Sequence, residues 1–155
     1  MDHTDCQGTT DQVIELLCNI DDMTGEALGY AMDLLFEEGA LDVFFQPIQM
    51  KKNRPGVLFH CLCKTEERDK FIQLILAHTT TRGVRYQTMD RVKLVSSYEE
   101  IQTPYGSVQN KISSGYGITK SKLEFDDVKA IAEKTGFSLE QVYAEIQAYI
   151  KRLSR

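Results

Sequence analysis

The chain has 155 residues, of which 42 % are hydrophobic and 26 % charged. A chain of this length hides about 70 % of its surface on folding, so it can build a real core, and its composition excludes a disordered chain, a collagen-like repeat and a coiled-coil rod. The net charge of −5 argues against a wholly basic nucleic-acid binder. Any anion site must therefore be a local basic cluster within an acidic background.

No apolar run approaches the ~20 residues that a membrane span needs, and residues 1–12 show no signal-peptide pattern. We expect a cytoplasmic protein with a flexible segment over 1–12 and a single domain over 13–155. The four cysteines form no CxxC pair, which argues against a structural zinc site. Cys61 and Cys63 share one face of a predicted strand, where free core thiols are favoured over a thiolate metal pair.

The first part of the chain alternates between apolar runs of strand length and helical stripes. Leu28, Ala31 and Leu35 recur at helical spacing, and Pro47 marks an edge strand or a bulge because it cannot donate a ladder hydrogen bond. The predicted strands are 13–20, 41–50, 57–63 and 84–96, and the predicted helices are 24–38 and 66–78. This βαββαβ order is the ferredoxin-like arrangement, in which both helices cover one face of an antiparallel sheet.

The rest of the chain adds a hairpin and two helices. Residues 99–103 and 107–113 flank the turn signature Pro104-Tyr105-Gly106, and 115–122 is predicted as a loop. A short helix is predicted over 125–134, and Ser138 with Gln141 forms a capping box for the last helix. The fold class is therefore α+β, with a β-rich core over about 13–113 and a helical part over about 123–155.

The first candidate site is a basic turn between two predicted strands. It contains three cations, an amide and a glycine, namely Lys51, Lys52, Asn53, Arg54 and Gly56. Lysine point charge and the arginine donor fork suit polyphosphate oxygens, and glycine lets the backbone come close to a ligand. The alternative is a solvated turn that only blunts an edge strand, and composition alone favours it.

The second candidate is a hydroxyl-rich and basic segment between a helix and a strand. Its donors are Thr79, Thr80, Thr81, Arg82 and Arg85. Hydroxyls and guanidinium groups are good phosphate donors. The alternative is a helix C-terminus with Gly83 as its cap and Arg82 facing the helix dipole.

The third candidate is the carboxylate pair Asp21 and Asp22 at the end of the first predicted strand. Adjacent carboxylates suit a hard cation such as Mg²⁺ or Mn²⁺ that bridges phosphates. The alternative is helix capping by Asp22 or Thr24. If one carboxylate caps the helix, the other is the better ligand candidate.

These segments resemble one known family. NIDDMTGEALGYAMDLLFEEGALDVFFQPIQMKKNRPG (19–56), TTTRGVRY (79–86), TPYGSVQNK (103–111) and LEFDDV (123–128) are similar, in this order, to the C-terminal domain of LarC. The resemblance covers about residues 13–150. It implies a CTP-dependent nickel insertase of the lyase class. Such an enzyme inserts nickel into pyridinium-3,5-bisthiocarboxylic acid mononucleotide, to mature the lactate racemase cofactor, and hydrolyses CTP.

The resemblance also implies ligands and partners. Lys51, Lys52, Asn53, Arg54, Thr79–Thr81, Arg82 and Arg85 become nucleotide-site candidates, with Asp21 and Asp22 as candidates for Mn²⁺ or Mg²⁺. Full members of the family carry a larger N-terminal domain, so we expect that domain as a partner. We expect nickel to be bound there, and this chain to bind CTP without completing the insertion. We expect no membrane or nucleic-acid partner.

CTP binding requires the basic turn and the threonine segment to converge, because the chain as a whole is acidic. Convergence across a subunit interface is one possibility, and the open sheet face and extra hairpin favour a homo-oligomer. The alternative functions are a non-catalytic module that senses a nucleotide and a pure assembly domain.

Overall fold

The structure is a computed structural model that describes residues 8–153. Internal contacts divide the chain into two compact units. The first unit is Thr10–Arg91, and the second begins at Val92 and also includes Gly8 and Thr9. The boundary between the units therefore lies before the hairpin predicted over 99–113. The sequence analysis placed that hairpin in the β-rich core over about 13–113.

The first unit contains the predicted βαββαβ elements. They are β1 (Thr9–Ile20), α1 (Gly25–Glu37), β2 (Asp42–Met50), β3 (Arg54–Lys64), α2 (Arg68–His78) and β4 (Arg85–Lys93), with short 3₁₀ turns at Lys51–Asn53 and Thr65–Glu67. The strand order is β2-β3-β1-β4, and β1 and β2 both run antiparallel to β3. This confirms the ferredoxin-like order, and Pro47 lies in the edge strand β2 as expected.

Local signals explain where α1 begins and ends. The Thr24 side chain caps its N-terminus by accepting a hydrogen bond from the Ala27 amide at 3.2 Å. Gly39, just beyond its C-terminus, has a φ of 96°, which glycine adopts at little cost. Both positions follow directly from the sequence pattern.

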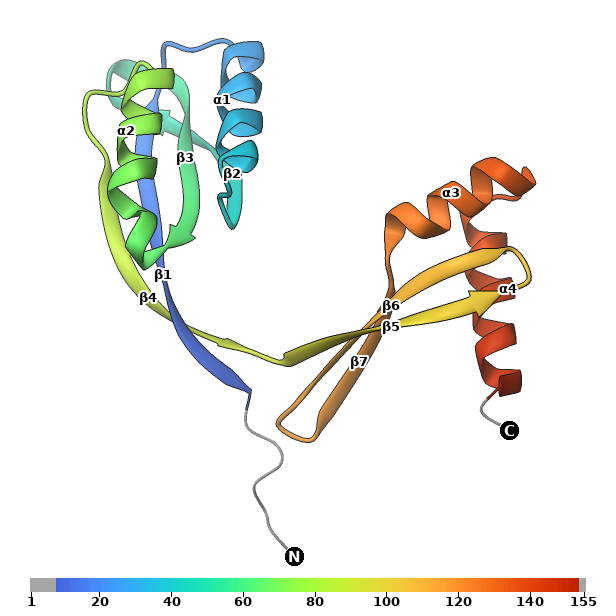
Figure 1. Cartoon of the computed structure of the whole chain (residues 1–155). Coiled ribbons are helices and arrows are strands. Elements are labelled where there is room, and N and C mark those ends of the chain that lie inside the picture. The colour runs from blue at the N-terminus through green and yellow to red at the C-terminus, as the bar shows by residue number, and fades with distance from the viewer. Residues whose placement is uncertain (1–7, 154–155) are drawn as a thin grey trace, which may run out of the picture. The chain divides into compact units, whose positions relative to one another are not determined.

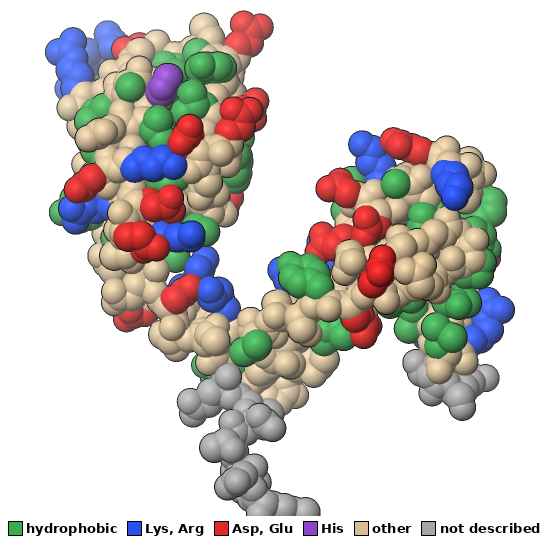
Figure 2. All heavy atoms as spheres, in the orientation of Figure 1, with side chains coloured by type: hydrophobic (Ala, Val, Ile, Leu, Met, Phe, Trp, Pro, Cys, Tyr) green, Lys and Arg blue, Asp and Glu red, His purple; other side chains and the backbone are tan. Residues whose placement is uncertain are grey.

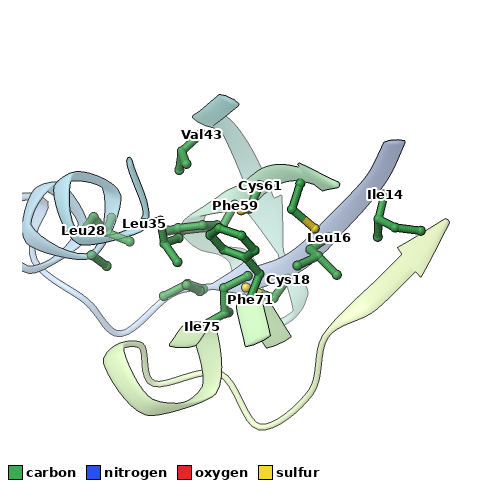
Figure 3. Close-up of a cluster of buried hydrophobic side chains, with 13 residues drawn as sticks. Ile14, Leu16, Cys18, Leu28, Leu35, Val43, Phe59, Cys61, Phe71 and Ile75 are labelled. Atoms are coloured by element: carbon green, nitrogen blue, oxygen red, sulfur yellow. The ribbon is translucent and has the colours of Figure 1, made fainter. Parts of the chain in front are cut away.

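The core of the first unit lies between the sheet and its two helices. Figure 3 shows Phe59 of β3 and Phe71 of α2 within a cluster that also contains Leu35 of α1. Cys18, Cys61 and Cys63 are buried free thiols in this cluster, which confirms the packing interpretation for these three. Burial raises the pKa of Cys61 to about 12, so its thiol stays protonated and unreactive at neutral pH.

The second unit is a three-stranded sheet covered on one face by two helices (Figure 1). Its elements are β5 (Val95–Thr103), β6 (Gly106–Gly115), β7 (Ile118–Leu123), α3 (Phe125–Thr135) and α4 (Leu139–Leu153). Val108 and Leu123 of the sheet pack with Val128 of α3 and Ile146 of α4. The predicted capping box is present, because Ser138 and Gln141 each donate a backbone N–H to the other's side chain.

Two predictions for this region were wrong. Residues 115–122, predicted as a loop, contain a tight hairpin turn and most of strand β7. Tyr116 and Gly117 both have positive φ (52° and 71°), which matches the twist of a two-residue hairpin. The predicted strand 84–96 is also two strands, because β4 ends at Lys93 and β5 begins at Val95.

The expected flexible segment 1–12 is replaced by strand from residue 9 onward, since β1 begins at Thr9. Its residues 1–7 lie outside the described residues. Over residues 8–153, no helix is both long and apolar enough to cross a membrane.

We predict that Phe71→Ala lowers the free energy of unfolding by about 3–5 kcal/mol, because it leaves a cavity in a fully packed core. Leu76→Ala on the same helix is the control, since Leu76 is 42 % exposed and its loss creates no cavity. Urea denaturation followed by circular dichroism measures both. Equal losses for the two variants would contradict this account of the core.

Candidate functional site

The end of β1 brings the predicted site segments together. β3 runs antiparallel to β1, with Val57 opposite Ile20, so the β2–β3 turn lies beside the last residues of β1. β4 flanks β1 on its other side. Figure 1 shows the β1–α1, β2–β3 and α2–β4 connections at the same end of this unit. We call the segments 19–22, 51–56 and 79–85 together the β1-end cluster.

Three side-chain contacts tie the β1-end cluster together. Arg54 Nη1 donates to Asp21 Oδ2 at 3.4 Å, and the Thr80 hydroxyl donates to the Asp22 carboxylate. Arg85 Nη2 donates to the Asn19 side-chain oxygen at 2.7 Å. The basic turn and the threonine segment therefore converge on one strand end within a single chain.

The β1-end cluster is basic although the chain is acidic. It holds five cationic side chains and two carboxylates, in a chain whose net charge is −5. Across residues 8–153, Lys51, Lys52 and Arg82 form no ion pair, and all three are exposed. Figure 2 shows blue side chains gathered at this end of the first unit. A multiply charged anion would meet an excess of positive charge here.

The basic turn has an unusual backbone. Lys52 and Asn53 have φ values of 60° and 57°, in the left-handed region that non-glycine residues rarely occupy. The Asn53 side chain is held by a 3.0 Å hydrogen bond from Gln49. Such conformations concentrate at ligand clamps, and here the strain presents two lysines and an arginine on one short turn.

Gly56 serves a close approach within the protein itself. A Cβ at this position would lie 2.7 Å from the Ile20 carbonyl oxygen and 2.7 Å from Met50 Sδ. The missing side chain thus lets β3 pack against the end of β1. The approach of Gly56 to a ligand stays a prediction, and the close approach that the structure shows is to Ile20 and Met50 of the same chain.

The threonine segment begins where α2 ends. Thr79 is the C-cap residue, and its hydroxyl donates to the Ile75 carbonyl at 2.7 Å. The alternative with Gly83 as helix cap is wrong, because α2 ends at His78 and Gly83 shows no left-handed φ. Thr81 lies next to the buried Cys18. Burial raises the pKa of the Cys18 thiol, and a hydrogen bond with the Thr81 side chain offsets part of that rise.

The carboxylate pair is not used for helix capping. Thr24 caps α1, so Asp21 and Asp22 each remain directed at a partner within the β1-end cluster. Among the residues that the structure describes, no three histidine, cysteine or acidic residues group closely enough to hold a metal ion. A divalent cation at Asp21 and Asp22 would therefore need ligand oxygens, such as those of a phosphate chain, to complete its coordination.

Sequence reasoning missed two features of this sheet. It assigned no role to Asn19, whose side-chain oxygen accepts a hydrogen bond from Arg85. The one signal for this role in the sequence is that alternate positions of β1 face away from the core, and Asn19 is one of them. It also missed the pairing of His60 with Glu15, 2.8 Å apart. Burial tends to raise the pKa of Glu15, but hydrogen bonds from His60 and Gln87 lower it overall.

Comparison with known proteins identifies the family. The family model described as nickel insertion protein matches residues 3–143. The chain belongs to the nickel insertion protein family. Within this family it is 42 % identical, over 90 % of its length, to the pyridinium-3,5-bisthiocarboxylic acid mononucleotide nickel insertion protein of Acetivibrio thermocellus. It is also 42 % identical, over 87 % of its length, to the protein of the same name from Lactiplantibacillus plantarum.

A solved structure is also similar to this chain. It is apo LarC2, the C-terminal domain of a cyclometallase involved in the synthesis of the NPN cofactor of lactate racemase. The match has a TM-score of 0.86 and 40 % identity, and covers 92 % of this chain and 99 % of that chain. The present chain spans only 34 % and 32 % of the two curated relatives. The two relatives therefore extend well beyond the part that this chain matches.

We predict that Gly56→Ala destabilises the first unit by about 1–3 kcal/mol, because the new methyl group would press on the backbone carbonyl of Ile20. Gly83→Ala is the matched control, since a Cβ there meets nothing within 4 Å. Thermal unfolding of both variants measures the difference. A stable Gly56→Ala variant would show that β3 does not need this close approach.

Proposed function

We propose that this chain is the CTP- and divalent-cation-binding part of a nickel insertase. The observation that carries the proposal is the convergence of the basic turn and the threonine segment on the Asn19–Asp22 strand end. The names of the family relatives support nickel insertion into pyridinium-3,5-bisthiocarboxylic acid mononucleotide as the reaction of the whole protein. The similarity to LarC2, a domain of a cyclometallase involved in NPN cofactor synthesis, supports the lactate racemase cofactor as the product.

The proposed nucleotide site is built on charge balance. A triphosphate carries several negative charges, which the exposed Lys51, Lys52 and Arg82 would offset by Coulomb attraction. The Arg54 side chain is 58 % exposed and, within residues 8–153, pairs only with Asp21, so its guanidinium group can turn to phosphate oxygens. The Thr80 hydroxyl donates to Asp22, and it could turn to a phosphate oxygen in the same way.

The proposed cation site follows from the same exchange. If Arg54 turns to phosphate, the Asp21 carboxylate loses its positive partner. A Mn²⁺ or Mg²⁺ ion would then take the place of the Arg54 charge beside Asp21. Asp22 lies in the same segment, so two carboxylates and the phosphate oxygens form a hard-oxygen donor set that fits such an ion. When bound, the ion would neutralise phosphate charge and orient the chain of phosphates.

Nickel is cargo in this proposal rather than a resident cofactor. The described residues hold no cluster that suits it, so we place its ligands in the larger part that the family relatives possess. CTP hydrolysis, the lyase-type insertion and a homo-oligomeric, cytoplasmic assembly likewise belong to the proposal for the whole protein.

Calorimetric titration of the chain with CTP, ATP and inorganic phosphate, with and without Mn²⁺, tests the function. We expect CTP binding that requires the cation and exceeds ATP binding. Equal binding of both nucleotides would instead indicate a sensing module. If no nucleotide releases or absorbs heat, the chain does not bind nucleotides, and a pure assembly domain becomes the favoured function.

We predict that Lys52→Ala and Arg54→Ala each weaken CTP binding by about tenfold, since each removes a charged donor. Both side chains are exposed, so the free energy of unfolding should change by less than about 1 kcal/mol. Lys64→Ala, at the opposite end of β3, is the matched control and should bind CTP normally. Unchanged binding in both test variants would contradict the placement of the site.

We predict that Asp21→Asn and Asp22→Asn raise the Mn²⁺ concentration needed for half-maximal CTP binding by about tenfold or more. Each substitution keeps the shape of the side chain and removes its charge. Asp33→Asn, on the exposed face of α1, is the control. If the two test variants need no more Mn²⁺ than the control, the cation binds elsewhere.

A further inference from the structure

One side chain of β2 spans the base of the basic turn. Strands β2 and β3 pair as far as Met50 and Arg54, so residues 51–53 form the loop between them. The Gln49 side-chain amide, near the end of β2, donates to the Asn53 side-chain oxygen at 3.0 Å. This hydrogen bond ties the last loop residue back to the strand that precedes the loop.

The loop has a backbone conformation that its sequence does not favour. Lys52 and Asn53 both lie in the left-handed region, with φ values of 60° and 57°. Glycine adopts this region freely and asparagine tolerates it, whereas lysine has no such preference. A loop that only joined two strands would be better served by glycine at position 52. The chain therefore keeps a lysine there at a cost to the backbone, which a role for its ammonium group explains.

Burial does not hold this loop in place. Gln49, Lys51, Lys52 and Asn53 are all exposed. An exposed hydrogen bond adds little net free energy to folding, because water competes for both of its partners. The Gln49–Asn53 hydrogen bond nevertheless restricts the conformations that the loop can adopt. Its loss should therefore affect what the loop binds more than how stable the fold is.

The residues that follow the loop are fixed against β1. Arg54 donates to Asp21 at 3.4 Å. Gly56 packs so closely on the end of β1 that a Cβ there would lie 2.7 Å from the Ile20 carbonyl oxygen. The basic turn is thus held by β1 on its C-terminal side and by Gln49 across its base. The two lysines lie between these fixed points.

We propose that Gln49 is a positioning residue for the nucleotide site: by holding Asn53, it keeps Lys51 and Lys52 in the arrangement that receives an anion. A loop that already has its binding conformation loses less conformational entropy when the ligand binds, so the ligand binds more tightly. Gln49 itself makes no contact with the ligand in this role. The inference rests on the proposed function, because it assigns a task at the proposed CTP site.

The variant Gln49→Met tests this role, since methionine has a similar length and cannot donate a hydrogen bond. We expect calorimetry to show that it binds CTP with Mn²⁺ about fivefold more weakly, the loss that a typical hydrogen bond gives. The midpoint of urea unfolding should not change. Gln46→Met, at an exposed glutamine of the same strand, is the matched control and should bind CTP as the unmodified chain does.

Two further measurements separate positioning from other roles. Nuclear magnetic resonance relaxation should show more motion of residues 51–54 in Gln49→Met than in Gln46→Met. Because Gln49 is uncharged, the dependence of CTP binding on salt should be the same in Gln49→Met as in the unmodified chain. Lys52→Ala, which removes a charge, should reduce that dependence.

A double-mutant cycle distinguishes positioning from direct contact with the ligand. In Asn53→Gly the hydrogen-bond partner is gone and glycine adopts the left-handed backbone without strain. Adding Gln49→Met to that variant should then change CTP affinity by less than about twofold. A fivefold loss that persists there would show that Gln49 contacts the ligand itself, which overturns the inference.

The inference and the proposed function can fail separately. If the unmodified chain binds CTP and Gln49→Met binds it equally well, or if residues 51–54 move no more in Gln49→Met, only the inference is overturned. If the unmodified chain binds no CTP, the proposed function and the inference are both overturned.

Discussion

The position of β1 inside its sheet is the constraint on which the candidate site depends. Backbone hydrogen bonds hold β3 antiparallel to β1, and β4 occupies the opposite flank. The connections that precede β3 and β4 therefore meet at the strand end where β1 turns into α1. Arg54, Thr80 and Arg85 come from two segments far apart in sequence, yet all contact Asn19–Asp22.

Charge distribution is the second theme of the molecule. The net charge of the chain is −5, yet the β1-end cluster holds five cationic side chains and two carboxylates. Within the β1-end cluster, Arg54 pairs with Asp21, so this ion pair would have to separate before Arg54 could bind an anion.

Much of the fold could be read from local pattern. The stripe of Leu28, Ala31 and Leu35, the cap at Thr24 and the glycine at position 39 specified α1, because each acts through neighbours within a turn or two. Strand β7 could not be found in this way. Its segment is polar, and the turn that creates the hairpin depends on Tyr116 adopting a left-handed backbone, for which tyrosine shows little preference.

The sequence by itself determined the βαββαβ order of the first unit and the resemblance to LarC, and it singled out the three candidate site segments. Only the tertiary structure decided that these segments meet within one chain, that Thr24 rather than Asp22 caps α1, and that Gly56 makes room for Ile20. Helical stripes and caps arise from residues close in sequence, whereas these contacts depend on strand pairing between distant residues, which no local pattern records.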